Sequence, residues 1–255
     1  MAHRDAGSCD IVRWYESHPR RRAHGSSGPP YDVEVDPLAG ATETILRAGR
    51  RLGARGLISA GEGNLSVRLD ADRLLTTPTG LRKDELTPDD LVVVWIDHPD
   101  REAVSRSGNV PSSDLAIHLA VHRARSDIRA VAHAHLPASM GLTLAGEIPD
   151  PAKLPETALL LPRLPFLAFG EPGSPELAGR IAAALSEPPE PQANAVLLER
   201  HGAVAVGRDP DQAVNRLELV EVLCRAWRDG LLIRAARISV AMVDEATSAS
   251  EREGP

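Results

Sequence analysis

Segments with two different hydrophobic periods alternate along residues 40–232. Residues 40–54 carry Ile45, Ala48 and Leu52 at helical spacing, whereas "NLSVRL" alternates apolar and polar residues as a half-buried strand does. The sequence predicts further helices over about 112–125, 136–145, 175–186 and 209–231, and further strands in "LLTT", "LVVVWID", "IRAVAHAH" and "AVLLERHGAVAVG". Residues 146–175 are rich in Pro and Leu without a clear period, so no element is predicted there. These patterns predict one large domain that mixes helices and strands.

Composition is that of an ordinary globular protein. The 255 residues are 42% hydrophobic and 25% charged, and the net charge of -7 argues weakly against a nucleic-acid-binding surface. The chain has two cysteines, Cys9 and Cys224, so a disulfide framework is excluded and a reducing compartment is expected. Its longest apolar runs, such as residues 91–96, are far shorter than the roughly 18 residues of a membrane span. We therefore expect a cytoplasmic protein that binds neither membranes nor nucleic acid.

The first 35 residues contain three consecutive arginines and "HGSSGPP" but no apolar period. Such a composition is typical of a poorly ordered segment. We expect a flexible N-terminal arm over residues 1–35, a folded domain over 36–240 and a C-terminal tail over 241–255.

Two histidines end one of the predicted strands. His133 and His135 stand two positions apart in "RAVAHAHLPAS", and side chains on a strand repeat with a period of two, so both project from one face. They either bind backbone carbonyls or water, or share a metal ion. His201 is the best third ligand, because Gly202 lets a strand turn bend while the imidazole points inward. Three neutral imidazoles suit a catalytic zinc, and ferrous iron, cobalt or manganese would also fit.

A second set of polar residues lies in a predicted helix. Asp114, His118 and His122 recur every four residues and therefore share one helix face. Taken alone, this spacing could also bind a metal. We expect instead that His118 is packed behind the site and that His122, among charged residues beyond the helix middle, faces solvent.

Three turn or helix-start segments could together bind an anion. They supply Gly63 and Asn64 of "GEGN", Thr79 and Gly80 of "PTG", and Ser112 and Ser113 of "PSS". Helix N-termini carry unpaired N–H groups and glycines allow close approach, so these segments could hold a phosphate or carboxylate. Taken one at a time, each is more simply explained as turn and cap chemistry.

The order of these motifs, GN-S, TPTG, PSSD-x3-H, H-x-H and RHG, resembles the class II aldolase/adducin family over about residues 40–232. The resemblance implies an α/β fold, namely a three-layer α/β/α domain with a central, mostly antiparallel sheet. It also implies a cyclic homotetramer with sites between neighbouring subunits. In that family pattern His133, His135 and His201 are the metal ligands and Asp114 is the catalytic residue. The residues that would hold a substrate phosphate are Gly63, Asn64, Thr79, Gly80, Ser112 and Ser113.

The activity implied by this resemblance is that of a zinc-dependent aldolase, a lyase acting on a small ketose phosphate. The metal would stabilise the enediolate formed as a carbon–carbon bond breaks, and Asp114 would move the proton. Phosphate binding away from the reacting carbons would restrict the orientation of the substrate.

Two departures from the family pattern leave the reaction open. Aldolases of this type usually carry Glu at the position of Asp114, and Phe166 stands where a proton-donating tyrosine occurs. Both tyrosines of the chain, Tyr15 and Tyr31, lie in the expected arm. The alternatives are a sugar-phosphate epimerase or dehydratase, a ferrous-iron oxygenase or decarboxylase of natural-product metabolism, and a non-catalytic interaction module. The phosphate cradle argues against the oxidative enzyme, and the complete histidine set argues against the interaction module.

Overall fold

The computed structural model describes residues 37–188 and 192–252, with side chains described as far as Met242. The chain divides into two units, Met1–Val35 and Asp36–Pro255, and every described element belongs to the second unit. The N-terminal arm expected over residues 1–35 lies outside the described residues. No helix among the described residues is both long and apolar enough to cross a membrane.

An eight-stranded sheet forms the middle layer of the second unit. The strand order is β4-β3-β2-β1-β5-β8-β7-β6, and neighbouring strands are antiparallel except for the parallel pair β6–β7. The strands are β1 (Asn64–Arg68), β2 (Arg73–Thr76), β3 (Val92–Trp95), β4 (Val104–Ser105), β5 (Ala130–Ala134), β6 (Phe166–Leu167), β7 (Ala195–Leu198) and β8 (Gly202–Gly207). Every residue of β5 and β8 is buried, because helices cover both faces of these central strands.

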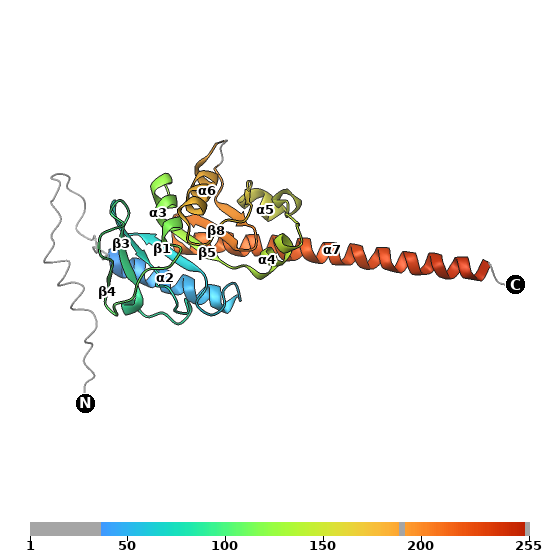
Figure 1. Cartoon of the computed structure of the whole chain (residues 1–255), viewed down its shortest axis with the longest axis horizontal. Helices are drawn as coiled ribbons and strands as arrows, with labels where there is room; N and C mark the ends of the chain where they lie inside the picture. The colour runs from blue at the N-terminus through green and yellow to red at the C-terminus, as the bar shows by residue number, and fades with distance from the viewer. Residues whose placement is uncertain (1–36, 189–191, 253–255) are drawn as a thin grey trace, which may run out of the picture. The chain divides into compact units, whose positions relative to one another are not determined.

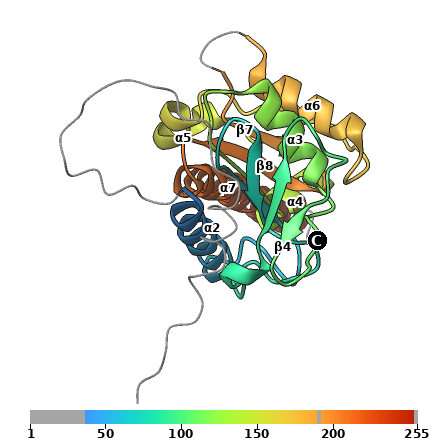
Figure 2. The same ribbon diagram turned by 90° about the vertical axis from the view of Figure 1, so that its left-hand side faces the viewer.

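Helices cover both faces of this sheet (Figure 1). The α-helices are α2 (Pro37–Ala54), α3 (Leu115–Ala124), α4 (Pro137–Leu144), α5 (Pro155–Leu160), α6 (Pro175–Ser186) and α7 (Pro210–Arg252). Figure 2 shows α3 and α6 together on one face and α2 and α7 together on the other. This agrees with the packing of α3 on α6 and of α7 on α2, β5 and β8. The expected three-layer α/β/α architecture with a mostly antiparallel sheet is confirmed.

The layer of α3 and α6 packs its apolar faces on the sheet. Ile117 and Val121 of α3 and Ile181 and Leu185 of α6 stand four residues apart, as an apolar helix face requires. They lie in one buried cluster with side chains of β5, β7 and β8, such as Val204. Burying a side chain of this size stabilises the fold by about 1.5–3 kcal/mol, so this cluster fixes the strands that carry the candidate ligands.

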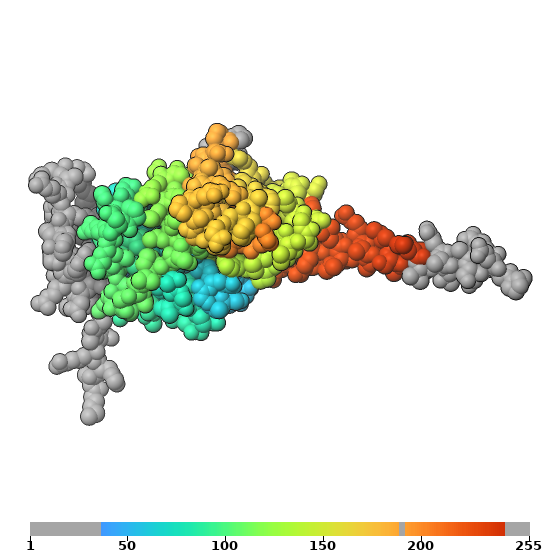
Figure 3. Space-filling view, in the orientation of Figure 1, coloured from blue at the N-terminus to red at the C-terminus, as the bar shows by residue number. Residues whose placement is uncertain are grey.

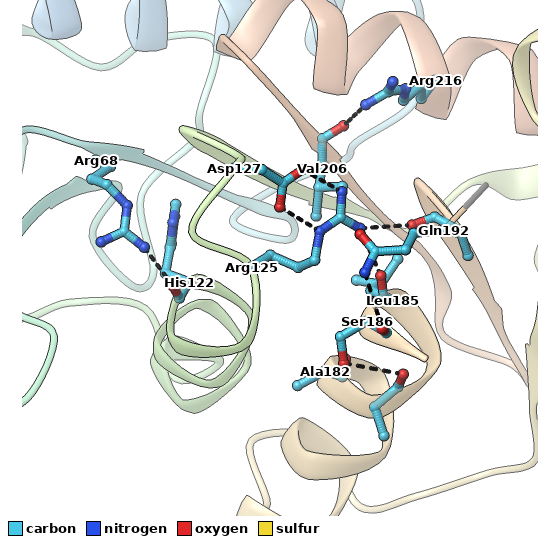
Figure 4. Close-up of polar contacts among 12 residues, drawn as sticks. Arg68, His122, Arg125, Asp127, Ala182, Leu185, Ser186, Gln192, Val206 and Arg216 are labelled. Atoms are coloured by element: carbon cyan, nitrogen blue, oxygen red, sulfur yellow. Dashed lines mark hydrogen bonds and ion pairs between the residues drawn. The ribbon is translucent and has the colours of Figure 1, made fainter. Parts of the chain in front are cut away.

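A buried arginine fastens the end of α3 to the α6 layer (Figure 4). Arg125 is 5% exposed, and its guanidinium donates to both carboxylate oxygens of Asp127 at 2.7 Å. It also donates to the carbonyl oxygens of Leu185 at 2.6 Å and Ala193 at 3.1 Å. A buried charge is tolerated when it is paired and hydrogen-bonded in this way. The contacts position the loop that leads into β5.

The segment without predicted elements contains several short ones. Residues 146–175 hold the 3-10 helix η2 (Pro151–Lys153), α5 and β6, and a further 3-10 helix, η1 (Pro88–Asp90), was also not predicted. These elements are two to six residues long, which is too short for a hydrophobic period to be read.

The last helix continues beyond its predicted end. The apolar stripe predicted a helix to about Leu231, but α7 runs to Arg252. At 1.5 Å per residue, its 43 residues span about 65 Å. All side chains from Leu232 to Met242 are exposed, and Figure 3 shows this part of α7 in red, extending away from the other described elements.

Candidate metal centre and substrate cavity

Two central strands and one tight turn bring three histidines together. His133 lies in β5, His135 directly follows that strand, and His201 lies in the turn between β7 and β8. Ala134 of β5 pairs with Ala203 of β8, which places the turn beside the end of β5. The three ring centroids are 4.7 to 5.0 Å apart, and one candidate ligand atom from each ring lies within 4.8 Å of the others. The structure therefore assembles the predicted triad.

The turn that presents His201 requires glycine at the next position. Gly202 has a φ of +81°, which side-chain-bearing residues rarely adopt. A Cβ at this position would lie 2.0 Å from the carbonyl oxygen of Ala134. The close approach of β8 to β5, and with it the position of His201, depends on the missing side chain.

We expect Gly202→Ala to lower the free energy of unfolding by about 3 kcal/mol, because both the backbone conformation and the Cβ contact become unfavourable. Urea denaturation followed by circular dichroism measures this change. Gly179→Ala is the matched control, since Gly179 is an exposed position of α6 with no atom within 4 Å of an added Cβ. The control should be neutral or more stable by up to about 1 kcal/mol. Equal stability of Gly202→Ala and the unmodified chain would contradict the argument.

The triad offers buried nitrogens that suit a cation. Nδ1 of His133 lies 3.0 Å from the carbonyl oxygen of Ala203 and donates to it, which leaves Nε2 with the lone pair. Nε2 of His133 and Nδ1 of His201 are buried without a hydrogen-bond partner among the described residues. Burial lowers the pKa of His133 to about 3 and also lowers the pKa of His201, so both rings are neutral near pH 7. Neutral imidazoles of this kind fit a divalent transition metal.

Asp114 is the carboxylate beside the triad. It precedes α3 and is 7% exposed, and its Oδ2 atom lies 3.9 Å from Nε2 of His133. The same oxygen accepts a hydrogen bond of 2.9 Å from Nδ2 of Asn64. Burial raises the pKa of Asp114. The nearby His133 and the hydrogen bond from Asn64 lower this pKa by a larger amount, so the net pKa is below its usual value. The carboxylate is therefore ionised at neutral pH and able to accept a proton.

A buried chain of hydrogen bonds fixes the amide of Asn64. Nε2 of His118 lies 2.7 Å from Oδ1 of Asn64, and Nδ1 of His118 lies 2.7 Å from Oγ of Ser66. Oγ of Ser66 in turn lies 3.0 Å from Nε2 of His122. Because the amide oxygen only accepts, His118 donates from Nε2 and accepts the Ser66 hydroxyl proton at Nδ1, and His122 donates to Ser66. This direction keeps the NH2 group of Asn64 facing Asp114.

His122 is buried, so the expectation that it faces solvent was wrong. The residue is 1% exposed, and its carbonyl oxygen accepts a hydrogen bond from Arg68 (Figure 4). The cause lies in β1, which presents the polar side chains of Asn64 and Ser66 to α3 and so supplies partners for both helix imidazoles. The expectation that His118 is packed behind the site is confirmed, since the residue is 0% exposed.

A cavity of about 230 Å³ lies beside Asp114 and the triad. Its lining includes His135, His201 and the predicted anion-binding residues Gly63, Asn64, Thr79, Ser112 and Ser113. His133 is 0% exposed and is not part of the lining. Gly80 is not part of it either, but its carbonyl oxygen is 3.0 Å from the position that a Cβ of Gly61 would take. The structure therefore brings five of the six predicted anion-binding residues to one cavity.

The sequence did not predict four residues of this lining, and two of the four, Lys83 and Glu62, carry charged side chains. Lys83 is 2% exposed, and its Nζ donates to the carbonyl oxygens of Gly61 and Leu81, each at 2.6 Å. Burial lowers the pKa of Lys83 to about 8, although Asp114 acts in the opposite direction. Glu62 places Oε2 3.1 Å from Nδ1 of His135. Neither residue belongs to a spacing pattern that marks a site, so tertiary structure was needed to find them.

The fold and the site together define a class of protein. Residues 43–228 match the class II aldolase and adducin N-terminal domain, so the chain belongs to this family. It is an enzyme of the class II aldolase superfamily.

Particular relatives carry different activities. The chain is 32% identical over 199 residues to methylthioribulose-1-phosphate dehydratase of Acidiphilium cryptum, which covers 74% of this chain and 90% of that protein. It is 32% identical over 184 residues to 3-oxo-tetronate 4-phosphate decarboxylase of Haemophilus influenzae, covering 70% of this chain and 82% of that one. The structure of L-fuculose-1-phosphate aldolase from Thermus thermophilus matches with a TM-score of 0.65 and 29% identity, covering 78% of this chain and 97% of that chain.

Proposed function

We propose that this chain is a divalent-metal-dependent aldolase that cleaves or forms a carbon–carbon bond in a small ketose phosphate. The observation that carries the proposal is an ionised carboxylate, Asp114, 3.9 Å from a histidine of a complete triad and at the wall of a cavity. The relatives described above support the substrate class, because each is named for a phosphorylated substrate. The triad and the carboxylate supply the metal-binding and proton-transfer groups that such a reaction needs.

In this proposal His133, His135 and His201 would hold the metal. Zinc is the first candidate, because three imidazoles with an open coordination position are typical of catalytic zinc sites. Ferrous iron, cobalt and manganese also accept imidazole ligands. The bound ion would act as a Lewis acid that draws electron density from a substrate carbonyl.

Asp114 would move the proton. In aldol cleavage a hydroxyl loses its proton as its oxygen becomes the carbonyl of the released aldehyde. The bond between two carbons breaks, and the carbon that keeps the electron pair takes up a proton. Asp114, ionised and oriented by Asn64, would accept the first proton and deliver the second.

The cavity residues would hold the substrate phosphate away from the reacting carbons. Hydroxyls, a side-chain amide and backbone N–H groups come from Gly63, Asn64, Thr79, Ser112 and Ser113 in the lining and from Gly80 next to it. Lys83 adds a cation to this set. The carbonyls of Gly61 and Leu81 use two protons of its ammonium group, so a third proton remains for an anion.

We expect Lys83→Met to weaken the binding of inorganic phosphate about tenfold at pH 7, because a charge-assisted hydrogen bond is lost. In the unmodified chain the affinity should fall as the pH rises through about 8, where Lys83 gives up its charge. The variant should lose this part of the pH dependence. Calorimetric titration at pH 7 and pH 9 measures both effects.

Lys153→Met is the control, because the Lys153 side chain is 65% exposed and lies outside the lining of the cavity. A Lys83→Met variant that binds phosphate as tightly as the control would remove Lys83 from the anion site.

Dehydration or decarboxylation of a similar substrate is the second candidate. The first observation in its favour is Phe166, which occupies β6, lies outside the cavity lining and has no exchangeable proton. Both tyrosines of the sequence, Tyr15 and Tyr31, precede the described residues. The second is the similarity to a dehydratase and a decarboxylase. An epimerase and a ferrous-iron oxygenase would use the same triad.

Metal analysis with a product assay tests these proposals. The purified chain is analysed for bound zinc, iron, cobalt and manganese, and is then incubated with a panel of ketose 1-phosphates. Release of dihydroxyacetone phosphate with about one zinc per chain supports the aldolase. Loss of water or carbon dioxide without that product supports the second candidate, and iron without any preference for phosphorylated compounds supports the oxidative alternative.

We further propose that the chain forms a homotetramer. Large apolar side chains are exposed on three helices that pack together, with Leu144 of α4 69% exposed, Leu159 of α5 77% exposed and Val222 of α7 54% exposed. Burying such side chains against other copies of the chain would be favourable. Sedimentation equilibrium should give four times the chain mass of 27.3 kDa, and a monomer at micromolar concentration would contradict the proposal.

A further inference from the structure

Glu62 is held by its own turn in a position that faces one histidine of the triad. The backbone N–H of Glu62 donates to the carbonyl oxygen of Ser59 at 3.1 Å. In return, Oε1 of Glu62 accepts a hydrogen bond of 2.6 Å from the backbone N–H of Ser59. The second carboxylate oxygen, Oε2, lies 3.1 Å from Nδ1 of His135. One oxygen therefore fixes the carboxylate and the other contacts the imidazole.

The contact favours one tautomer of a neutral His135. A carboxylate oxygen only accepts, so a proton on Nδ1 of His135 would face Oε2 of Glu62 at 3.1 Å and leave the lone pair on Nε2. His133 has the same tautomer for a different reason, because its Nδ1 donates to the carbonyl oxygen of Ala203. Two of the three imidazoles thus present the same nitrogen as ligand, one supported by a neutral carbonyl and the other by a full negative charge.

The Glu62 side chain is only 28% exposed, so its charge is partly removed from water. Among the described residues, its ion pairs include no lysine or arginine. Glu62 also lines the cavity in which an anionic substrate group is proposed to bind. The negative charge of Glu62 would repel a phosphate, so the presence of this carboxylate in the lining needs a reason other than substrate binding. Its contact with His135 supplies one.

We propose that Glu62 is a positioning residue that orients His135 and raises the basicity of its Nε2 toward a divalent cation. The inference rests on the proposed metal site formed by the triad. Carboxylates that accept the second N–H of a metal-binding histidine typically change metal affinity 10–100-fold. A glutamine at this position has a single acceptor oxygen, which cannot serve Ser59 and His135 together.

The test is a metal competition with the full-length, zinc-loaded chain against a chromophoric chelator. Glu62→Gln should raise the zinc dissociation constant by about 10-fold or more. The same variant should bind inorganic phosphate at least as tightly as the unmodified chain, because a negative charge leaves the cavity. A general disturbance of the site would weaken the binding of both zinc and phosphate. Weaker zinc binding together with unchanged or tighter phosphate binding therefore identifies the role of the carboxylate.

Asp90→Asn is the matched control, because the Asp90 carboxylate accepts from the backbone N–H three residues earlier, as Glu62 does, but in a turn that lies outside the cavity lining. Its zinc affinity should equal that of the unmodified chain. A Glu62→Gln variant within twofold of the control would overturn the inference while leaving the metal site intact. An unmodified chain that binds no zinc, cobalt, iron or manganese would overturn both the inference and the proposed function.

Nitrogen-15 NMR of the imidazoles gives a second readout without metal. In the unmodified chain His135 should be the Nδ1–H tautomer, and in Glu62→Gln the Nε2–H tautomer should gain population. An unchanged tautomer would overturn the positioning role.

Discussion

Replacing His133 by alanine is expected to abolish metal retention and turnover while the chain remains folded. Its Nε2 is buried, unpartnered among the described residues and adjacent to the other two imidazoles. Removing a ligand should cost more than the roughly 10–100-fold loss that follows from disturbing a ligand's support. Metal content after dialysis, measured by mass spectrometry beside a circular dichroism melting curve, separates loss of metal from loss of fold.

His98→Ala is the control for this experiment, because His98 is exposed and lies outside the triad. It should keep its metal and its turnover. His135→Ala should behave like His133→Ala, since both rings belong to the triad. Full metal occupancy in either triad variant would show that these histidines do not hold the ion.

Asp114→Asn should lower kcat by about 10²–10⁴-fold while metal is retained. Asparagine keeps the shape of the side chain and can still accept the hydrogen bond from Asn64, so the cavity should be preserved. It cannot accept a proton from substrate, however. Turnover of the best substrate from the ketose-phosphate panel, measured together with metal content, separates proton transfer from metal binding.

Asp89→Asn is the control, because Asp89 is exposed and forms a surface ion pair with Arg106. It should leave kcat unchanged. An Asp114→Asn variant that keeps more than a tenth of the turnover would remove Asp114 from the proton-transfer step. Loss of metal together with turnover would instead assign it to ion binding.

Prediction from sequence succeeded where a local pattern has one structural cause. The apolar run that ends in His133 and the glycine after His201 each encode a backbone geometry, and the structure shows both, although His135 directly follows β5 instead of lying in it. The helical period likewise predicted α6 over residues 175–186, and the bounds agree. In these places the pattern depends on strand and helix geometry, which neighbouring residues determine.

Prediction failed where partners come from distant parts of the chain. His122 lies among charged residues in the sequence, but Ser66 of β1, 56 residues away, gives its ring a buried partner. Lys83 is buried because its ammonium group meets the carbonyl of Gly61, 22 residues away. Such pairings follow from how strands and loops assemble, and no local period encodes them.

The placement of the triad on β5 and the β7–β8 turn has a consequence for the life of the protein. β5 and β8 lie in the interior of the sheet, and core strands of this kind typically open at the free energy of global unfolding. An ion bound there would add its binding free energy to global stability, about 4 kcal/mol at a free concentration 1,000 times the Kd. Metal starvation would then shorten the lifetime of the protein as well as stop its reaction, because the unfolded population exposed to proteases would rise.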